Sequence, residues 1–175
     1  GHADGTIYEI FEEAVKKDME IIGISEHGPS MLCSATKMHF WMGPRLPEQE
    51  IEVLWGIEAN VLDKTGQTDI PDEHTENMDY ACVALHRATG MEDLGVAGNT
   101  EALINAMDHP KVKFVSHPTH QQYEVDIEEV CEAAIEKDLW LEINLAYLRR
   151  RNHDRTEEMI EFARDRGGKF IINSD

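Results

Sequence analysis

Apolar and polar residues follow two different periods along the chain. Four segments space apolar residues three or four positions apart and carry acidic residues near their starts, which predicts amphipathic helices. Six shorter segments are apolar runs rich in β-branched residues, which predicts strands covered on both faces. The predicted helices span Thr6–Asp18, Asn99–Met107, Asp126–Lys137 and Thr156–Arg166. The predicted strands span Glu20–Ser25, Val53–Ile57, Tyr80–Leu85, Lys113–Ser116, Leu139–Ile143 and Lys169–Asn173.

Strands and helices largely alternate, which predicts an α/β fold whose parallel sheet is open or closed into a barrel. One stretch interrupts the alternation, because Gly28–Gln49 contains three prolines, two glycines and little periodicity. Proline and glycine end regular elements, so we expect a long loop with a short helix there. The sequence shows neither an internal repeat nor an interdomain linker. Residues 1–175 are therefore predicted to form a single domain.

A polar side chain stands at the carboxyl end of each predicted strand. In parallel sheets these ends meet at one edge, where the active sites of such folds lie. One histidine alone is more often a satisfied core residue than a ligand, but three at strand ends favour ligands. Imidazole and carboxylate together suit zinc, iron or manganese, and several such groups can hold more than one ion. The residues that predict this metal cluster are His27, Glu58, His86, His117, Asn144 and Asp175.

Arginines near this edge are candidate anion-binding groups in an otherwise acidic chain. Arg149–Arg151 follow shortly after the strand that leads to Asn144, and Arg87 adjoins His86. A guanidinium can bind two phosphate oxygens at once. A run of arginines is equally typical of a solvated helix start, so both interpretations stay open.

The other histidines after the first helix carry weaker signals. His74, His109 and His153 lie in polar contexts away from strand ends, which predicts solvated surface positions. His39, in the long loop, and His120, shortly after a strand end, stay open between structural and functional roles.

The charge balance disfavours some classes of binding partner. The chain has 35 acidic and 16 basic residues and a formal net charge of -19, which disfavours nucleic acid and anionic membranes. No apolar run approaches the ~20 residues that span a bilayer, so we expect a cytoplasmic protein. Cys33, Cys82 and Cys131 are far apart and lack CxxC spacing. They predict reduced, mostly buried thiols rather than disulfides or a thiolate zinc site.

Seven short motifs, in this order, resemble those of the PHP (polymerase and histidinol phosphatase) superfamily, and most closely its YcdX-type phosphoesterase branch. They are HADGT, ISEHGP, GIEAN, ALHR, VSHP, LEIN and INSD. The resemblance covers essentially the whole chain. It implies a distorted (β/α)7 barrel with a trinuclear metal centre, usually zinc or manganese, that hydrolyses phosphate esters.

The resemblance also implies roles for single residues. Glu58 is similar to the carboxylate that bridges two metals, and His86 and His117 would complete the ligands of the second metal. Asp175 would belong to the first metal.

The third metal would be bound by His2 and His27. The family usually has Asp before the latter histidine, whereas this chain has Glu26, which affects the surroundings of the ligand more than ligation itself. The family begins with a strand carrying His-x-His and has Asp-x-His as its last motif. We therefore expect that the chain lacks the first strand and the C-terminal end of a longer protein, with a histidine two positions beyond Asp175.

These observations together predict a metal-dependent phosphoesterase. A metal-bound hydroxide at a multinuclear site would hydrolyse a small phosphomonoester. Glu58 and Asp175 are the predicted catalytic carboxylates, and Arg87 and Arg150 the predicted phosphate-binding groups. The predicted partners are a small phosphorylated substrate and no membrane, with a homo-oligomer left open.

Several alternatives remain. A PHP-type phosphodiesterase or exonuclease is the second choice, and a non-catalytic metal-binding regulatory domain is the rival from another class. An amidohydrolase-type enzyme would be expected to carry a carboxylated lysine. Lys111 and Lys113 lie at the wrong end of their strand for that role.

Overall fold

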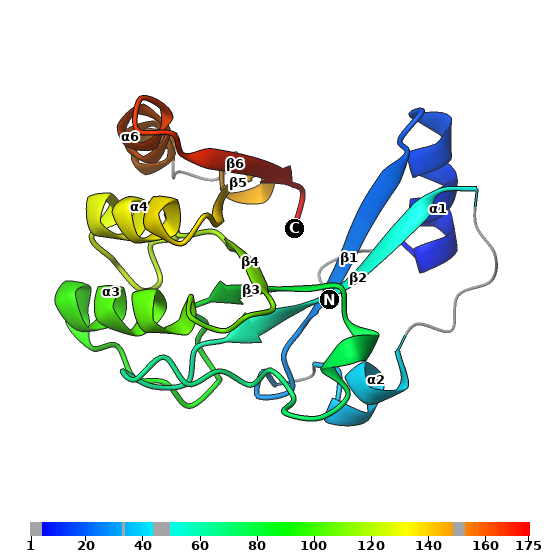
Figure 1. Cartoon of the computed structure of the whole chain (residues 1–175), viewed down its shortest axis with the longest axis horizontal. Helices are drawn as coiled ribbons and strands as arrows, with labels where there is room; N and C mark the ends of the chain where they lie inside the picture. Colours follow the sequence, from blue (N-terminus) through cyan, green and yellow to red (C-terminus); the bar gives the residue numbers. More distant parts are fainter. Residues whose placement is uncertain (1–4, 33, 44–49, 149–152) are drawn as a thin grey trace.

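The computed structural model describes residues 5–32, 34–43, 50–148 and 153–175. Six parallel strands form one sheet whose spatial order follows the sequence, from β1 to β6. The sheet curls into a half-barrel with helices against it (Figure 1). The strands are β1 (Ile21–His27), β2 (Glu52–Asn60), β3 (Tyr80–Ala84), β4 (Val112–Val115), β5 (Trp140–Asn144) and β6 (Lys169–Asn173). All six predicted strands and the α/β class are confirmed, while a seven-stranded closed barrel stays a prediction.

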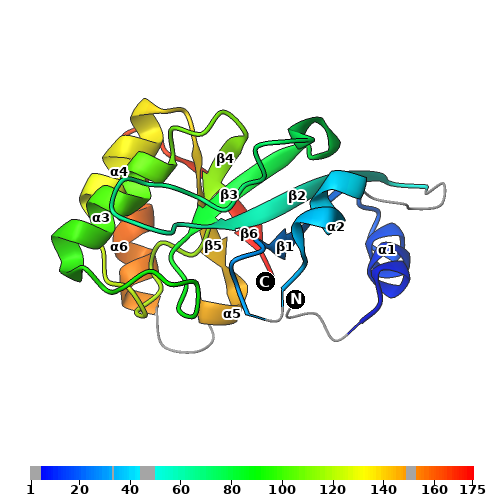
Figure 2. The ribbon, with the colours of Figure 1, turned by 90° about the horizontal axis from the view of Figure 1, so that it is seen from below.

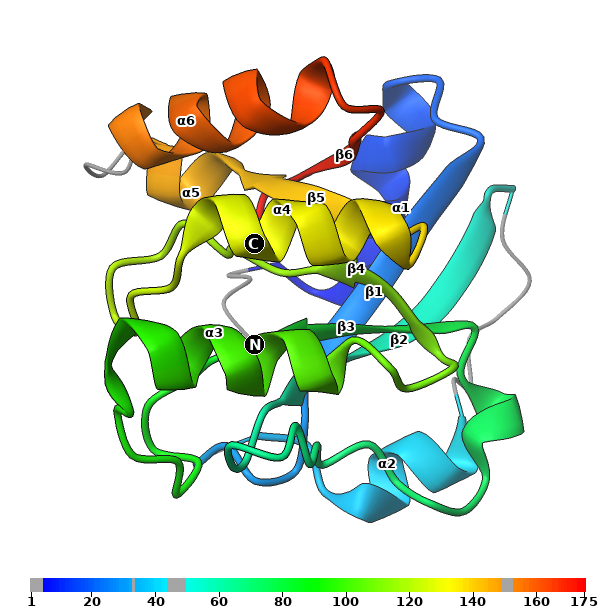
Figure 3. The same ribbon diagram turned by 60° about the vertical axis from the view of Figure 1, so that its left-hand side comes forward.

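Three long helices cover the outer face of the curled sheet. They lie side by side in Figures 1 and 3, and α4 contacts both of its neighbours. In α4 the buried positions recur three and four residues apart, at Ile127, Val130, Cys131 and Ala134, which is the pattern of a helix with one face on the core. The three helices are α3 (Gly95–Ala106), α4 (Ile127–Glu136) and α6 (His153–Arg164).

Helix α1 (Ile7–Lys16) lies at the opposite end of the molecule from those three helices (Figure 2). Its start is fixed by a capping box. The backbone N–H of Thr6 donates to Glu9 Oε2, and the N–H of Glu9 donates to Thr6 Oγ1. These two bonds satisfy amide groups that the first helical turn leaves unpaired. Phe11 and Ala14 are the buried residues of this helix.

The remaining helical segments are short. The predicted short helix in the long loop is α2 (Lys37–Met42), which contacts the single turn η1 (Thr75–Asn77). One further turn, α5 (Leu145–Leu148), follows directly on β5. Loop residues 44–49 lie outside the described residues. No helix in the described ranges is long and apolar enough to cross a membrane.

The structure corrects three predicted boundaries of helices and strands. Helix α3 begins at Gly95, four residues before the predicted Asn99, and α6 begins at His153 rather than Thr156. Strand β2 continues past Ile57 to Asn60, because its last residues pair with β3.

Coverage of both faces holds for the middle of the sheet but is wrong for β1 and β6, whose residues are exposed or half-buried. Among the described residues these two strands each pair on one side only. Each therefore has less of the protein packed around it than a central strand has.

Candidate metal centre

The parallel register brings four predicted site residues together. His27, the last residue of β1, stands opposite Glu58 on β2. His86 follows β3 by two residues, and His117 follows β4 by two residues. Because neighbouring parallel strands end at the same edge, two strands and two loops bring these side chains to one place. The prediction that they converge is confirmed.

The carboxylate of Glu58 lies among three histidine rings. Its Oε2 is 3.4 Å from His27 Nε2. Its Oε1 is 3.0 Å from His117 Nε2 and 3.7 Å from His86 Nε2. The rings of His27 and His86, and those of His86 and His117, meet edge to face with centroids 5.0 Å apart. The two oxygens of one carboxylate thus face different imidazoles.

The ring of His86 is oriented by Asn60, which sequence reasoning missed. Asn60 Nδ2 donates to Asp69 Oδ2 at 2.6 Å and to Gly28 O at 3.2 Å. Its Oδ1 therefore faces His86 and accepts from His86 Nδ1 at 2.8 Å. Since Nδ1 carries the proton, Nε2 of His86 keeps the lone pair that a metal ligand needs.

Asp69 fixes Asn60 from the loop between β2 and β3. Its carboxylate also accepts from the backbone N–H groups of Asn60 and Ser30, both at 2.8 Å. Gly28 makes this approach feasible, since a Cβ at that position would lie 2.1 Å from Asp69 Oδ1. These contacts hold the segment after β1 against the loop after β2, next to the pair formed by Asn60 and His86.

A second buried carboxylate, Glu142 on β5, lies behind His117. Its Oε2 accepts from the backbone N–H of His117 at 2.7 Å and from Ser116 Oγ at 3.1 Å. Ser116 Oγ also lies 2.8 Å from Glu58 Oε1, as a donor to that oxygen. His117 has a φ of 31°, in the left-handed region that residues other than glycine seldom adopt. Glu142 therefore helps to hold a strained backbone position.

Burial and mutual charge set the protonation of these groups. Burial raises the pKa of Glu58, but the hydrogen bond and charge of His117 outweigh it and hold that pKa well below its ordinary value. Burial lowers the pKa of His117, but the hydrogen bond and charge of Glu58 outweigh this and raise it. Burial lowers the pKa of His86 to about 3. A neutral His86 beside an ionised Glu58 is the state in which both can bind a cation.

Polar and aromatic side chains lie around His117. Asp175 Oδ2 accepts from Asn144 Nδ2 at 3.2 Å, so the last described residue lies at the predicted edge. The ring of His120 lies 5.7 Å from that of His117 and 4.2 Å from that of Tyr147. Burial, together with the charge of His117, lowers the pKa of His120 to about 4. The structure thus places His120 beside the predicted ligand His117, and its role stays open.

Arg87 is exposed and directly follows His86 in the chain. Its positive charge is one of the smaller effects on the pKa of His120 and on that of Tyr123, after burial. Two predicted site residues lie outside the described residues: the ligand His2 and the phosphate-binding Arg150. The same holds for Arg149 and Arg151.

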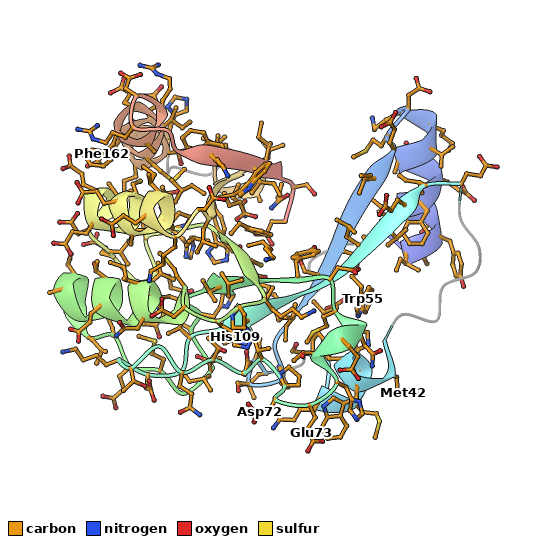
Figure 4. The ribbon with its side chains drawn as sticks, viewed as in Figure 1. Met42, Trp55, Asp72, Glu73, His109 and Phe162 are labelled. Atoms are coloured by element: carbon orange, nitrogen blue, oxygen red, sulfur yellow. The ribbon has the colours of Figure 1, made fainter. Side chains whose placement is uncertain are left out.

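Three of the other histidines lie at or near the surface. His74 and His153 are exposed, as predicted. His109 is half-buried instead, because its Nδ1 accepts from the N–H of Lys111 in the turn before β4. His109 and Asp72, both labelled in Figure 4, line one cavity that no predicted ligand lines.

His39 packs among aromatic residues. Its ring lies 5.1 Å from that of Trp55 and 5.2 Å from that of Phe40. The open interpretation of His39 is thus resolved toward packing. Cys82 and Cys131 are free and buried, as predicted, whereas Cys33 lies outside the described residues.

The donor set fits a divalent transition metal. Ligand atoms of His27, Glu58 and His86 all lie within 4.8 Å of one another. Nε2 of His86 carries a lone pair and yet lies 3.1 Å from Nε2 of His117. Two ring nitrogens at this distance need a proton or another cation between them. Imidazole nitrogen and carboxylate oxygen are ligands of zinc, iron and manganese.

Comparison with known proteins gives relatives of one kind. A probable phosphatase of Caldanaerobacter subterraneus is 38% identical over 146 residues, which cover 82% of this chain and 58% of that protein. A probable phosphatase of Clostridium acetobutylicum is 32% identical over 180 residues, which cover all of this chain and 73% of that protein. The chain thus spans little more than half of the first relative and about three quarters of the second. No family model matches.

A solved structure supports the fold. The crystal structure of histidinol phosphate phosphatase from Lactococcus lactis, a complex with zinc, L-histidinol and phosphate, matches with a TM-score of 0.61. The match covers 99% of this chain and 81% of that one at 12% identity, so it shows a shared fold. Because the Clostridium relative is matched over most of its length, the chain belongs to this family of probable phosphatases, and at that level the prediction of a phosphoester hydrolase is confirmed.

Proposed function

We propose that this protein is a metal-dependent phosphoesterase whose substrate is a small phosphomonoester. One observation carries the proposal: three imidazoles from successive strand ends surround both oxygens of one buried carboxylate. The names of the relatives support the class of reaction. The sequence motifs support a finer placement, in the YcdX-type branch of the PHP superfamily with a (β/α)7 barrel.

Glu58 is proposed to bridge two cations. Its Oε1 faces His86 and His117, and its Oε2 faces His27. A carboxylate that bridges two ions needs this arrangement, since each of its oxygens binds one ion together with a different set of side chains. Asp175 reaches the same edge through its hydrogen bond with Asn144 and is proposed as a further ligand. His2 is proposed from the sequence motif alone, and with it a third ion.

A bound divalent metal would lower the pKa of water, orient it for attack and neutralise charge on the phosphoryl oxygens. The chain's own residues prepare this chemistry. Asn60 keeps the proton of His86 on Nδ1, so that Nε2 points to the site unprotonated. Ser116 donates to Glu58 Oε1 and holds that oxygen in place. Zinc and manganese are the proposed metals, and iron suits the same ligands.

The rim favours a small anion over a polymer. Arg87, which is exposed and adjoins His86 in the chain, is proposed to bind two oxygens of a phosphate monoester. Arg150 is proposed for the same task from the sequence. The overall charge of -19 would repel a nucleic acid along its length, whereas a small phosphate meets the local field of the metals and arginines.

A side-by-side comparison of substrates tests this proposal. The full-length protein, loaded with manganese or zinc, is assayed for kcat/KM on small phosphomonoesters, a phosphodiester and single-stranded DNA. The proposal predicts that the monoesters are turned over best. A higher kcat/KM for the diester or DNA would replace it with the nuclease alternative. Metal binding without turnover of any ester would leave a non-catalytic metal-binding domain.

A further inference from the structure

Glu142 is a buried carboxylate that none of the roles above uses directly. Its relative exposure is 4%, and it lies on β5, between β4 and the last strand of the sheet, β6. Ionised carboxylates are seldom fully buried, because burial removes the water that stabilises their charge. The protein must therefore compensate this charge locally, and the way it does so indicates what the group is for.

Hydrogen-bond donors from three neighbouring strand ends converge on Glu142. After β4, the N–H of His117 and the hydroxyl of Ser116 approach Oε2 at 2.7 and 3.1 Å. From β5, Asn144 Nδ2 lies 3.1 Å from the same oxygen. From β6, Asn173 Nδ2 donates to Oε1 at 2.6 Å. Four contacts tie β4, β5 and β6 together at the edge that carries the metal centre.

All four donors are electrically neutral, so they stabilise the charge of Glu142 without cancelling it. Ser116 Oγ has one proton and lies within reach of Glu58 at 2.8 Å and Glu142 at 3.1 Å. One hydroxyl therefore stands between two buried carboxylates. In the metal-free protein a proton on His117 offsets part of the repulsion between these two charges, and a divalent ion at Glu58 would offset more of it.

We propose that Glu142 is a positioning residue of the metal centre. Its hydrogen bonds hold His117 at the backbone angle that points the ring to Glu58, and its charge strengthens cation binding there. The inference rests on the proposed function, because it presumes that Glu58 binds a metal. It adds a buried anion that touches neither substrate nor metal and acts through His117 and Ser116.

The contrasting explanation is a purely structural brace between strands. The two explanations predict opposite signs for Glu142→Gln. A brace predicts a less stable metal-free protein whose folded fraction binds metal as before. A positioning charge predicts a metal-free protein that is as stable as wild type or more stable, because the repulsion with Glu58 is gone, and weaker metal binding. Gln can keep three acceptor contacts through its Oε1, and the Asn173 amide can turn its oxygen to the new NH2 group.

The experiment measures metal affinity and thermal unfolding of the full-length wild type and Glu142→Gln. We expect the Kd for zinc or manganese to rise by about 10–100-fold, as for other residues that orient metal ligands. We expect the metal-free unfolding temperature to stay equal or rise. Glu52→Gln, which removes an exposed charge from the first residue of β2, is the control and should leave Kd unchanged.

A second variant keeps the test decisive if Glu142→Gln fails to fold. Glu142→Asp retains the charge but shortens the side chain and weakens its contacts with His117 and Ser116, so metal-free stability should fall while Kd rises by less than about tenfold. An unchanged Kd in Glu142→Gln, or a tenfold rise in Glu142→Asp, overturns the charge role while the proposed function stands. If the wild-type protein binds no metal, both the role of Glu142 and the proposed function are overturned.

Discussion

His86 and His117 face each other with their Nε2 atoms 3.1 Å apart, both on the same side of Glu58 Oε1. The contact joins two strand ends that are 31 residues apart in sequence. Because Asn60 accepts the Nδ1 proton of His86, the pair shares the single proton that His117 Nε2 can carry. A metal ion that replaced this proton would bind both nitrogens and the carboxylate oxygen. This geometry is the basis of the predictions below.

Asn60→Leu should weaken metal binding without unfolding the protein. The substitution removes the oxygen that accepts from His86 Nδ1 and frees the ring to take the other tautomer or to turn. We expect the Kd for zinc to rise by about tenfold or more, as when the hydrogen-bond partner of a ligating histidine is lost. Asn105→Leu, at a half-buried amide whose Nδ2 donates to Lys64 O, is the control. Equal zinc affinity in both variants would refute the role of Asn60.

Gly28→Ala should destabilise the protein. The new Cβ would lie 2.1 Å from Asp69 Oδ1, and that carboxylate is held by the N–H groups of Asn60 and Ser30 and cannot move freely. Overpacking of this kind costs about 1–3 kcal/mol of unfolding free energy. Chemical denaturation measures it, with Gly5→Ala as the control, where the nearest atom is 3.6 Å away. A Gly28→Ala protein as stable as wild type would contradict the described contact.

Arg87→Ala should raise KM for a phosphomonoester while leaving metal content unchanged. We proposed above that the guanidinium binds phosphate oxygens, and a guanidinium does not ligate metal. A loss of about 1.4 kcal/mol in phosphate binding corresponds to a tenfold higher KM. Arg164→Ala removes an exposed arginine on α6 that pairs with Asp165 and should leave KM at the wild-type value. A lower metal content in Arg87→Ala would show that the residue acts on the metal centre instead.

The two described cysteines should resist alkylation in the native protein. Burial raises the pKa of Cys131 to about 12, and Cys82, which is fully enclosed, has its pKa raised as well. The thiolate is the reactive form, so almost none of it is present at pH 8. Mass spectrometry after iodoacetamide treatment should find both thiols unmodified until a denaturant is added. Rapid native labelling of Cys131 would show that α4 does not pack as described.

The meeting of the strand-end residues could be predicted, because the ends of parallel strands follow a simple rule. Parallel strands end at one edge, so Glu58, His86 and His117 had to meet once their strands were assigned. Asn60 and Glu142 were detectable by the same logic but were missed. Each lies two positions from a predicted residue on its strand, Asn60 from Glu58 and Glu142 from Asn144, and such residues share one face.

Other partners could not be predicted from local pattern. Asp69 comes from an irregular loop, and nothing in its sequence neighbourhood specifies that it folds back on Asn60. The contact between the tilted rings of His120 and Tyr147 depends on the turn that Asn144 caps after β5. Both contacts depend on three-dimensional loop geometry, which hydrophobic periodicity does not encode.

The most direct test of the account is a metal titration in which occupancy and activity are measured on the same samples. Metal-free full-length protein receives increasing manganese or zinc, and elemental analysis is paired with the initial rate on a small phosphomonoester. The account predicts that the rate rises in step with bound metal, and that Glu58→Gln, folded by circular dichroism, shows neither. Turnover in metal-free protein, or full metal binding and activity in Glu58→Gln, would contradict it.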